Sequence, residues 1–370
     1  MDENVIGQRF TYYRGRVAMA ELLKAAGVRK GDEVAIQAFT CVAVPEAVLS
    51  IGACPVYIDI ERDGYNMASA SLAGRLTDRI KAVVVQHTFG LPADLTALGS
   101  VAGQAGIPVI EDCCHTYHSR VGGALVGQNC FGAFSSVEWG KPIAAGIGGV
   151  AWSGHAEVRE KLAVSLTHFT PPATARGLKL WLQLLAHRVL YRPSWYWPVR
   201  RAFKLLARLG AAEGNYNAMA EVAVAPDFHW KMVGHVERRV TRMMRELADI
   251  TAHADAVAER YRTGIRGLRA VHPSPLPGTR AVYVRYPLRV ANKPALLAAA
   301  RKANVELGDW YSTPIHPLGP RDWATVAYQA GSCPEAEKRC GEVVTLPTHR
   351  ATRMRDVDRA ITLFNQDPIH

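Results

Sequence analysis

Residues 135–147 read SSVEWGKPIAAGI, and a single lysine, Lys141, stands in this run between a glycine and a proline. A long cationic side chain usually lies on a solvated face among other charges, whereas its neighbours here are small and apolar. A lysine partly shielded from water has its ammonium form disfavoured, so its pKa falls and its amine becomes a usable nucleophile. The alternative is an ordinary lysine of a solvated loop. The context favours an amine that forms a Schiff base with a carbonyl compound.

Two candidate partners of this lysine precede it in the chain. Asp112 ends the apolar run IPVIED at 107–112, and His115 follows it three residues later. An amine of this kind most often holds pyridoxal phosphate (PLP), whose ring acts as an electron sink. PLP needs a carboxylate near its pyridine nitrogen, for which Asp112 is a candidate, and hydroxyl and N–H groups for its phosphate, which Ser136 and a helix N-terminus offer. There is an alternative for each residue. Asp112 is equally typical of an acid that ends a strand and caps the next turn, and His115 is then a histidine with a structural role in that turn.

The first half of the chain alternates short apolar runs with segments of helical periodicity. Runs of continuous apolar character separated by helices of about ten residues indicate a parallel sheet covered on both faces. Ligands of such sheets bind at the carboxyl ends of the strands, which is where Asp112 falls. We expect helices at 14–28, 44–52, 67–76 and 95–106, and strands at 32–39, 54–60, 81–90 and 107–112.

The pattern changes from about residue 230. Residues 235–265 predict one long amphipathic helix with mixed charges, and 281–290 alternate as a strand does. A helix at 293–305 and a helix, strand and helix within 333–364 follow. The sequence therefore predicts an α/β protein with a large domain at 1–235 and a smaller α+β domain at 236–370.

Composition excludes several other classes of protein. The net charge is +11, but eight Lys and Arg residues and no acidic residue lie between 167 and 210, so the excess is regional and we expect no nucleic-acid partner. The N-terminus lacks the apolar core of a secretory signal, and no run approaches the ~18 apolar residues that span a bilayer. The seven cysteines are scattered, without metal-like spacing. We expect reduced thiols in a cytoplasmic protein without a metal, with Cys333 and Cys340 packed in a helix.

Residues 175–210, within an insertion at about 168–227, combine leucines and tryptophans with arginines. They predict two short helices broken at Pro193. Leu- and Trp-rich faces with a purely cationic polar side are typical of helices that lie on an anionic membrane. The alternative is a pair of helices that cover the active site or a dimer interface, with their tryptophans buried. Nucleic-acid binding is disfavoured because the aromatic residues lie on apolar helical faces and not on a sheet platform.

The order and spacing of several longer stretches carry a family resemblance. They are KGDEVAIQAFTCVAVPEAVLSIGACPVYIDI, HTFGLPADL, PVIEDCCHTYHS, FGAFSSVEWGKPIAAGIGGV, WYSTPIHP and VVTLPTH. Together they resemble the DegT/StrS-type family of PLP-dependent nucleotide-sugar aminotransferases, which have the fold-type-I architecture. The similarity extends from about Gly15 to Leu363.

The resemblance implies a role for each matching residue. Lys141 would carry the cofactor, Asp112 would pair with its pyridine nitrogen, His115 would lie beside the ring near its hydroxyl, and Ser136 would bind the phosphate. The remaining matches fall on Gly15 and Arg16 in a phosphate-binding turn, on Cys41 where an aromatic residue usually stacks on the ring, and on Tyr311 and His316 toward the substrate.

The resemblance also implies a homodimer with shared active sites. FHWKM at 228–232 resembles a family segment that reaches into the neighbouring subunit, with His229 in the place of an asparagine. Some matches are imperfect: Arg16 replaces a small hydroxyl residue, and it either meets the phosphate or obstructs it. His316 either faces the sugar or caps a loop.

The activity implied is transfer of an amino group from an amino acid, most often glutamate, to a nucleotide-linked keto-sugar in glycan or antibiotic biosynthesis. Two alternatives remain. A sugar dehydratase of the same fold is disfavoured by Lys141, because relatives with that activity lack the lysine. The second alternative is a membrane-associated protein that keeps the fold without turnover. Cys41, Arg16 and the insertion support it.

Overall fold

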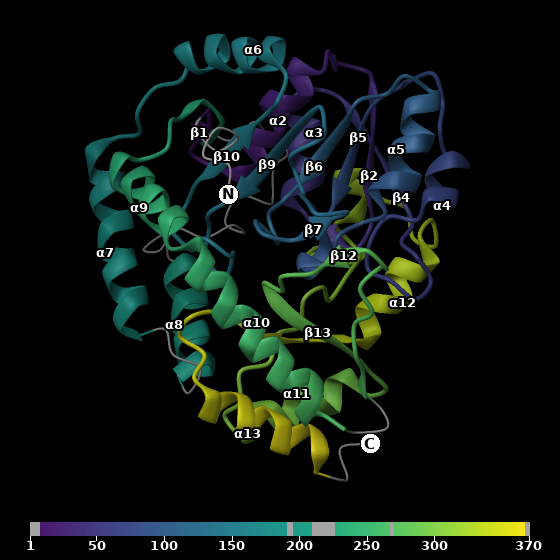
Figure 1. Ribbon diagram of the computed structural model, residues 1–370. Coiled ribbons are helices and arrows are strands. Elements are labelled where there is room, and N and C mark those ends of the chain that lie inside the picture. Colours follow the sequence, from purple (N-terminus) through teal and green to yellow (C-terminus); the bar gives the residue numbers. More distant parts are fainter. Residues whose placement is uncertain (1–7, 191–194, 209–225, 267–269, 367–370) are drawn as a thin grey trace.

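A computed structural model describes residues 8–190, 195–208, 226–266 and 270–366 (Figure 1). Pro193, where the sequence predicts a break between two helices, lies outside the described residues, as do 209–225 of the insertion. The first half of the chain forms a sheet with helices on both faces, and the C-terminal part lies beside it (Figure 1).

The central sheet has seven strands within the described residues, in the order β1-β10-β9-β6-β5-β2-β4. The five strands from β9 to β4 are mutually parallel, whereas β10 is antiparallel to β9 and β1 is antiparallel to β10. The prediction of a mostly parallel sheet is confirmed. The strands are β1 Phe10–Tyr12, β2 Glu33–Gln37, β4 Cys54–Ile58, β5 Ile80–Gln86, β6 Val109–Asp112, β9 Gly132–Ser136 and β10 Gly149–Trp152.

Both faces of this sheet are buried, and the alternation of side chains along β5 shows why its apolar run is continuous. Val84 packs into a core cluster with residues of α2 and α3, whereas Val83 and Val85 pack into a second cluster with residues of α4 and α5. Successive residues of a strand point to opposite faces, so both must be apolar when helices cover both sides. The covering helices are α2 Gly15–Ala25, α3 Ala43–Ser50, α4 Ser69–Ala73, α5 Leu95–Gln104 and α6 Ala156–Thr167.

The C-terminal part has an apolar core of its own. An antiparallel sheet in the order β11-β13-β15 packs with helices, and the residues of this cluster all come from positions 257–364. The cluster supports the proposed small α+β domain, whose boundary at 235/236 stays a prediction. The elements of this core are α10 Leu247–Gly264, β11 Ala270–Val271, β13 Arg285–Val290, α11 Lys293–Lys302, β15 Val343–Pro347 and α13 Met354–Asn365. α12, at Pro334–Glu342, instead packs Ala336 and Cys340 into the core cluster of the large sheet.

The single long helix predicted at 235–265 is wrong, because the segment forms two consecutive helices. α9 covers Gly234–Arg245 and α10 follows after Glu246, whose backbone angles of φ −88° and ψ 7° leave the α-helical range. The two helices bury their apolar faces in different places. Val236 and Val240 pack with residues of the large sheet, whereas Val257 packs in the C-terminal core. Because of the break at Glu246, the apolar residues of α9 and those of α10 face different cores.

The insertion contributes two helices, α7 Thr174–Leu190 and α8 Tyr196–Arg208, at the edge of the molecule (Figure 1). The prediction of two helices is confirmed for these residues. None of the helices in the described part of the chain is long and apolar enough to cross a membrane. Short elements complete the fold: β3 Thr40–Cys41, β7 Arg120–Val121, β8 Ala124–Leu125, β12 Thr279–Arg280, β14 Ile315–His316, η1 Thr88–Gly90, η3 Pro226–His229 and η4 Trp323–Val326.

Candidate functional site

Asp112 is the last residue of β6 and is buried at the carboxyl edge of the sheet. Its Oδ1 accepts a hydrogen bond of 2.8 Å from the backbone N–H of Cys114. Burial raises the pKa of the Asp112 carboxyl, while the Cys114 N–H and the positive charge of Lys141 oppose that shift. A protonated pyridine nitrogen beside this carboxylate would oppose it further, so the position suits a partner with a positive charge.

Lys141 lies in the turn after β9 and is partly buried. Its backbone N–H donates to the carbonyl oxygen of Glu138 at 3.2 Å, and its Nζ lies 5.6 Å from the ring centroid of Trp310. The ammonium group is close enough to Asp112 and His115 to change the pKa of both. The structure therefore brings the lysine and the carboxylate of the sequence hypothesis into one site.

His115 is buried between two elements of this site. Its Nδ1 accepts the backbone N–H of Phe89 at 3.0 Å, and its Nε2 lies 3.4 Å from the hydroxyl of Tyr311. Burial, and then the charge of Lys141, hold the pKa of His115 well below its ordinary value. The ring is therefore neutral with its proton on Nε2, and it stacks on Trp310 at an interplanar angle of 9°. It offers a flat surface and one N–H donor.

Ser136 meets the N-terminus of α2. An ideal Cβ built on Gly15 lies only 2.9 Å from the Cβ of Ser136, so glycine is required for this approach. The N-cap residue of α2, Arg14, directs its guanidinium to Asp227 at 2.6 Å and to Glu138 at 3.4 Å. The first backbone N–H groups of a helix lack intrahelical partners and attract anions. These N–H groups and the Ser136 hydroxyl form a cradle that fits a phosphate.

Three further residues that the sequence predicts for the site are Cys41, His316 and Arg16. Cys41 of β3 is in parallel register with His316 of β14, whose Nδ1 lies 2.9 Å from Ser312 Oγ. Burial raises the pKa of Cys41, and Lys141 acts in the opposite direction. The buried guanidinium of Arg16 pairs with Glu46 of α3. Its backbone N–H belongs to the first turn of α2.

His229 does not join this group in the protomer. Its side chain is exposed at the end of η3, and its carbonyl oxygen accepts the backbone N–H of Thr170 at 3.0 Å. Its predicted contact with a neighbouring subunit stays a prediction.

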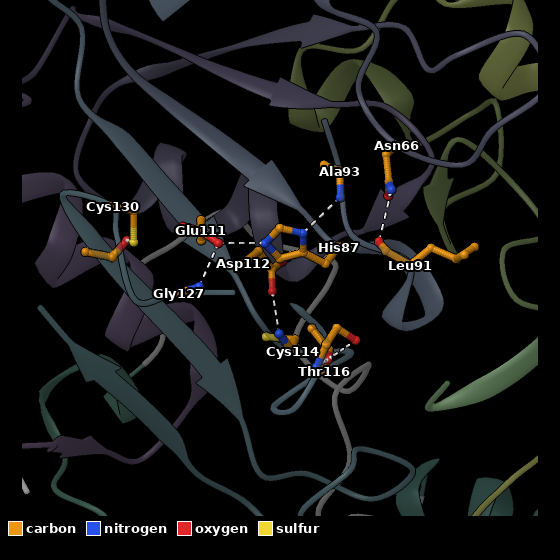
Figure 2. A network of polar contacts seen from close by, with 12 residues as sticks. Asn66, His87, Leu91, Ala93, Glu111, Asp112, Cys114, Thr116, Gly127 and Cys130 are labelled. Atoms are coloured by element: carbon orange, nitrogen blue, oxygen red, sulfur yellow. Dashed lines mark hydrogen bonds and ion pairs between the residues drawn. The ribbon is translucent and has the colours of Figure 1, made fainter. Parts of the chain in front are cut away.

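Sequence reasoning missed a buried pair behind Asp112 (Figure 2). His87 Nδ1 accepts the N–H of Ala93 at 3.1 Å, so its Nε2 carries the proton and donates to Glu111 Oε2 at 2.9 Å. The same oxygen accepts the N–H of Gly127 at 2.7 Å. Burial alone would raise the pKa of Glu111, but these hydrogen bonds hold it below its ordinary value. The pair fixes the ends of β5 and β6 on either side of the site.

Trp310 was also not predicted as a site residue, although it precedes Tyr311 in the motif WYSTPIHP. An aromatic residue in a loop carries no local signal of its partner, because the ring of His115 comes from a segment almost two hundred residues away. The two rings and Tyr311 form a stacked wall that contacts Lys141.

The parallel sheet, the lysine and carboxylate at its ligand edge, and the anion cradle define the class of the pyridoxal-phosphate enzymes of α/β fold. Residues 11–176 and 239–365 match the model of the DegT/DnrJ/EryC1/StrS aminotransferase family, and the chain belongs to this family. It is therefore an aminotransferase that uses PLP, as the sequence predicted.

Individual relatives agree with this assignment. The chain is 26% identical over 363 residues (95% of this chain, 82% of the relative) to UDP-N-acetyl-3-dehydro-alpha-D-glucosamine 3-aminotransferase of Acidithiobacillus ferrooxidans. It is 26% identical over 353 residues (94% and 82%) to dTDP-3-amino-3,4,6-trideoxy-alpha-D-glucose transaminase of Micromonospora megalomicea. The fold matches the PLP form of a putative sugar aminotransferase of Streptococcus pneumoniae with a TM-score of 0.75 at 17% identity, covering 96% of this chain and 86% of that one.

Proposed function

We propose that this aminotransferase moves an amino group from an amino acid, glutamate, to a nucleotide-linked keto-sugar in glycan or antibiotic biosynthesis. The two named relatives are enzymes of UDP- and dTDP-linked sugars. The observation that carries the proposal is the meeting of Lys141 and Asp112 at one end of the sheet, next to the cradle of Gly15 and Ser136.

PLP, when bound, supplies a ring that withdraws electrons from the substrate carbon. The Lys141 amine would hold the cofactor and, once released, would carry the proton from the donor's carbon to a carbon of the cofactor, and in the opposite direction when the keto-sugar receives the amino group. Asp112 keeps the pyridine nitrogen protonated, since a buried carboxylate is ionised most readily opposite a positive charge. Ser136 Oγ and the N–H groups of Gly15 and Arg16 bind the phosphate, and His115 keeps its single donor next to the ring.

Tyr311 and His316 border the same space from the C-terminal part of the chain, which supports their roles toward the substrate. Both are buried, and their ring centroids lie 5.6 Å apart. Cys41, in register with His316, replaces the ring-stacking aromatic residue of the family. The stacked rings of His115 and Trp310 provide an aromatic surface in this site.

We further propose a cytoplasmic homodimer in which each subunit's His229 completes the other's site. The exposed side chain of His229 at the end of η3 supports this arrangement. Light scattering should give twice the mass of 40.4 kDa, and His229→Ala should reduce cofactor affinity without changing the fold. A monomer with full activity would contradict this part of the proposal.

The activity is tested with purified protein, PLP and a panel of ¹⁵N-labelled amino acids against nucleotide-linked keto-sugars. Mass spectrometry should detect label in the sugar product, with glutamate as the best donor. Lys141→Arg should give no product and should retain a folded circular dichroism spectrum. A PLP-loaded wild type that transfers no nitrogen from any donor would favour the alternative of a protein without turnover.

A further inference from the structure

The outer face of α7 is a continuous apolar stripe. Its residues recur at helical spacing and are exposed, with 58% exposure at Leu178, 54% at Leu182 and 64% at Val189. Trp181 and Leu185 complete the stripe. Large apolar side chains that are exposed in a continuous row indicate an interaction surface.

The opposite face of α7 already has its partners within the protomer. Leu180 is buried beside Tyr13, and His187 stacks on Trp139 with ring centroids 4.3 Å apart. Arg176 lies over the ring of Trp230. These contacts anchor the helix through its inner face, and among the residues that the structure describes the outward stripe stays exposed.

α8 repeats this arrangement. Its inner residue Trp197 is buried and donates its Nε1–H to the carbonyl oxygen of Val305 at 2.9 Å, and Arg200 pairs with Asp309 at 3.1 Å. By contrast, Leu205 and Leu206 of α8 are exposed, as is Trp195 directly before the helix. Trp197 is therefore buried within the protomer, whereas Trp181 and Trp195 are exposed on it.

The charged residues of the insertion's own helices are all cationic. The sequence has no Asp or Glu between Glu160 and Glu213. Arg188 of α7 lies near Arg239 of α9, and burial followed by the charges of Arg242 and Arg188 lowers the pKa of Arg239. The positive charges of these arginines repel one another, and an anionic partner would reduce that repulsion.

We propose that the outward faces of α7 and α8 dock onto the surface of an anionic lipid membrane. Leucine and tryptophan side chains next to arginines match the apolar boundary and the negative headgroups of such a surface. A second copy of the chain fits less well, because two identical patches whose own charged residues are all cationic offer each other no opposite charge. The proposed contact is with the membrane surface, and none of the described helices is long and apolar enough to cross a bilayer.

The test is co-sedimentation of the full-length PLP-loaded protein with vesicles. Vesicles of phosphatidylcholine with phosphatidylglycerol should bind the protein, and phosphatidylcholine alone should bind it at least about tenfold more weakly. Binding to the anionic vesicles should weaken as salt is raised. Arg188→Gln should reduce the binding constant about fivefold, and Leu182→Glu should reduce it by more than about tenfold.

Val164→Glu is the matched control, because Val164 of α6 is as exposed as Leu178 and lies outside the patch. It should bind vesicles as the wild type does. The proposal is wrong if the wild type stays in the supernatant with anionic vesicles at low salt, or if Leu182→Glu binds unchanged. It is also wrong if Leu182→Glu turns a dimer into a monomer in light scattering, since the face would then join two copies.

Discussion

The substitution Gly15→Ala places a methyl group inside the proposed phosphate cradle. The new Cβ would lie 2.9 Å from Ser136 Cβ and 3.5 Å from Ser136 Oγ. Carbon atoms in contact prefer a separation of about 3.5–4.0 Å, so the two backbones must separate by roughly 0.6 Å or more. Ser136 belongs to β9, which is paired with β6 on one side and β10 on the other, and it has little freedom to withdraw.

The magnitude follows from two opposing terms. Overpacking costs about 1–3 kcal/mol, and the higher helix propensity of alanine returns at most about 1 kcal/mol. We therefore expect the free energy of unfolding of the cofactor-free protein to fall by about 1–2 kcal/mol. The separation of the Gly15 and Ser136 backbones also weakens at least one charge-assisted hydrogen bond to the phosphate. Such a bond contributes about 1.5–3 kcal/mol, so the Kd of PLP should rise about 10- to 100-fold.

Urea unfolding of the cofactor-free protein measures the first quantity, and a PLP titration followed by absorbance measures the second. Gly99→Ala in α5 is the matched control, because a Cβ at Gly99 meets no atom within 4 Å. It should stabilise the protein by about 0.5–1 kcal/mol and leave the Kd of PLP unchanged. A Gly15→Ala protein with the wild-type Kd would refute the assignment of the cradle.

Two further predictions concern buried polar groups. Burial alone would raise the pKa of Glu306, but His349 and Arg285 hold it at about 2, below the unfolded value of about 4.3. This ion pair therefore stabilises the fold above pH 4.3, and that stabilisation is lost as the pH falls toward 2. Glu306→Gln should lower the free energy of unfolding by about 3 kcal/mol at pH 7 and flatten this acid dependence, as measured by urea unfolding. Tyr311→Phe removes the hydroxyl that faces His115; it should cost about 1 kcal/mol of stability and shift the absorbance maximum of bound PLP.

Each of these changes has a control elsewhere in the chain. Glu259→Gln breaks an exposed pair with Arg262 and should leave the free energy of unfolding nearly unchanged, because water and salt screen the two charges. Tyr57→Phe removes a buried hydroxyl that donates to Val326, away from the site, and should leave the PLP spectrum unchanged. Equal acid dependence in wild type and Glu306→Gln, or equal spectral shifts in the two tyrosine variants, would contradict the reasoning.

The elements of the large sheet could be predicted because local patterns determine them. The apolar runs of β2, β5 and β6 are continuous since helices cover both faces, and glycines follow the helices between them. The carboxyl ends of parallel strands meet at one edge, so Asp112 and Ser136 could be placed there from their positions after such runs. Lys141 lies only five residues after Ser136, so it could be expected near the same edge.

What could not be predicted depends on contacts between distant segments. The pairing of Arg14 with Asp227 joins residues more than two hundred positions apart, and neither residue stands in a recognisable motif. Arg16 was expected to meet or obstruct the phosphate, but a carboxylate from α3, Glu46, takes its guanidinium. The break at Glu246 likewise depends on which core each helix faces, and helical periodicity alone does not show that.

The most direct test of the central claim is to locate the lysine that holds PLP. The purified protein should absorb in the visible range, borohydride should fix the cofactor covalently, and peptide mass spectrometry should find the added mass on Lys141. Lys141→Ala should abolish the covalent product while keeping the circular dichroism spectrum of the wild type. A label on any other lysine, or a yellow Lys141→Ala protein that borohydride still modifies, would contradict the account.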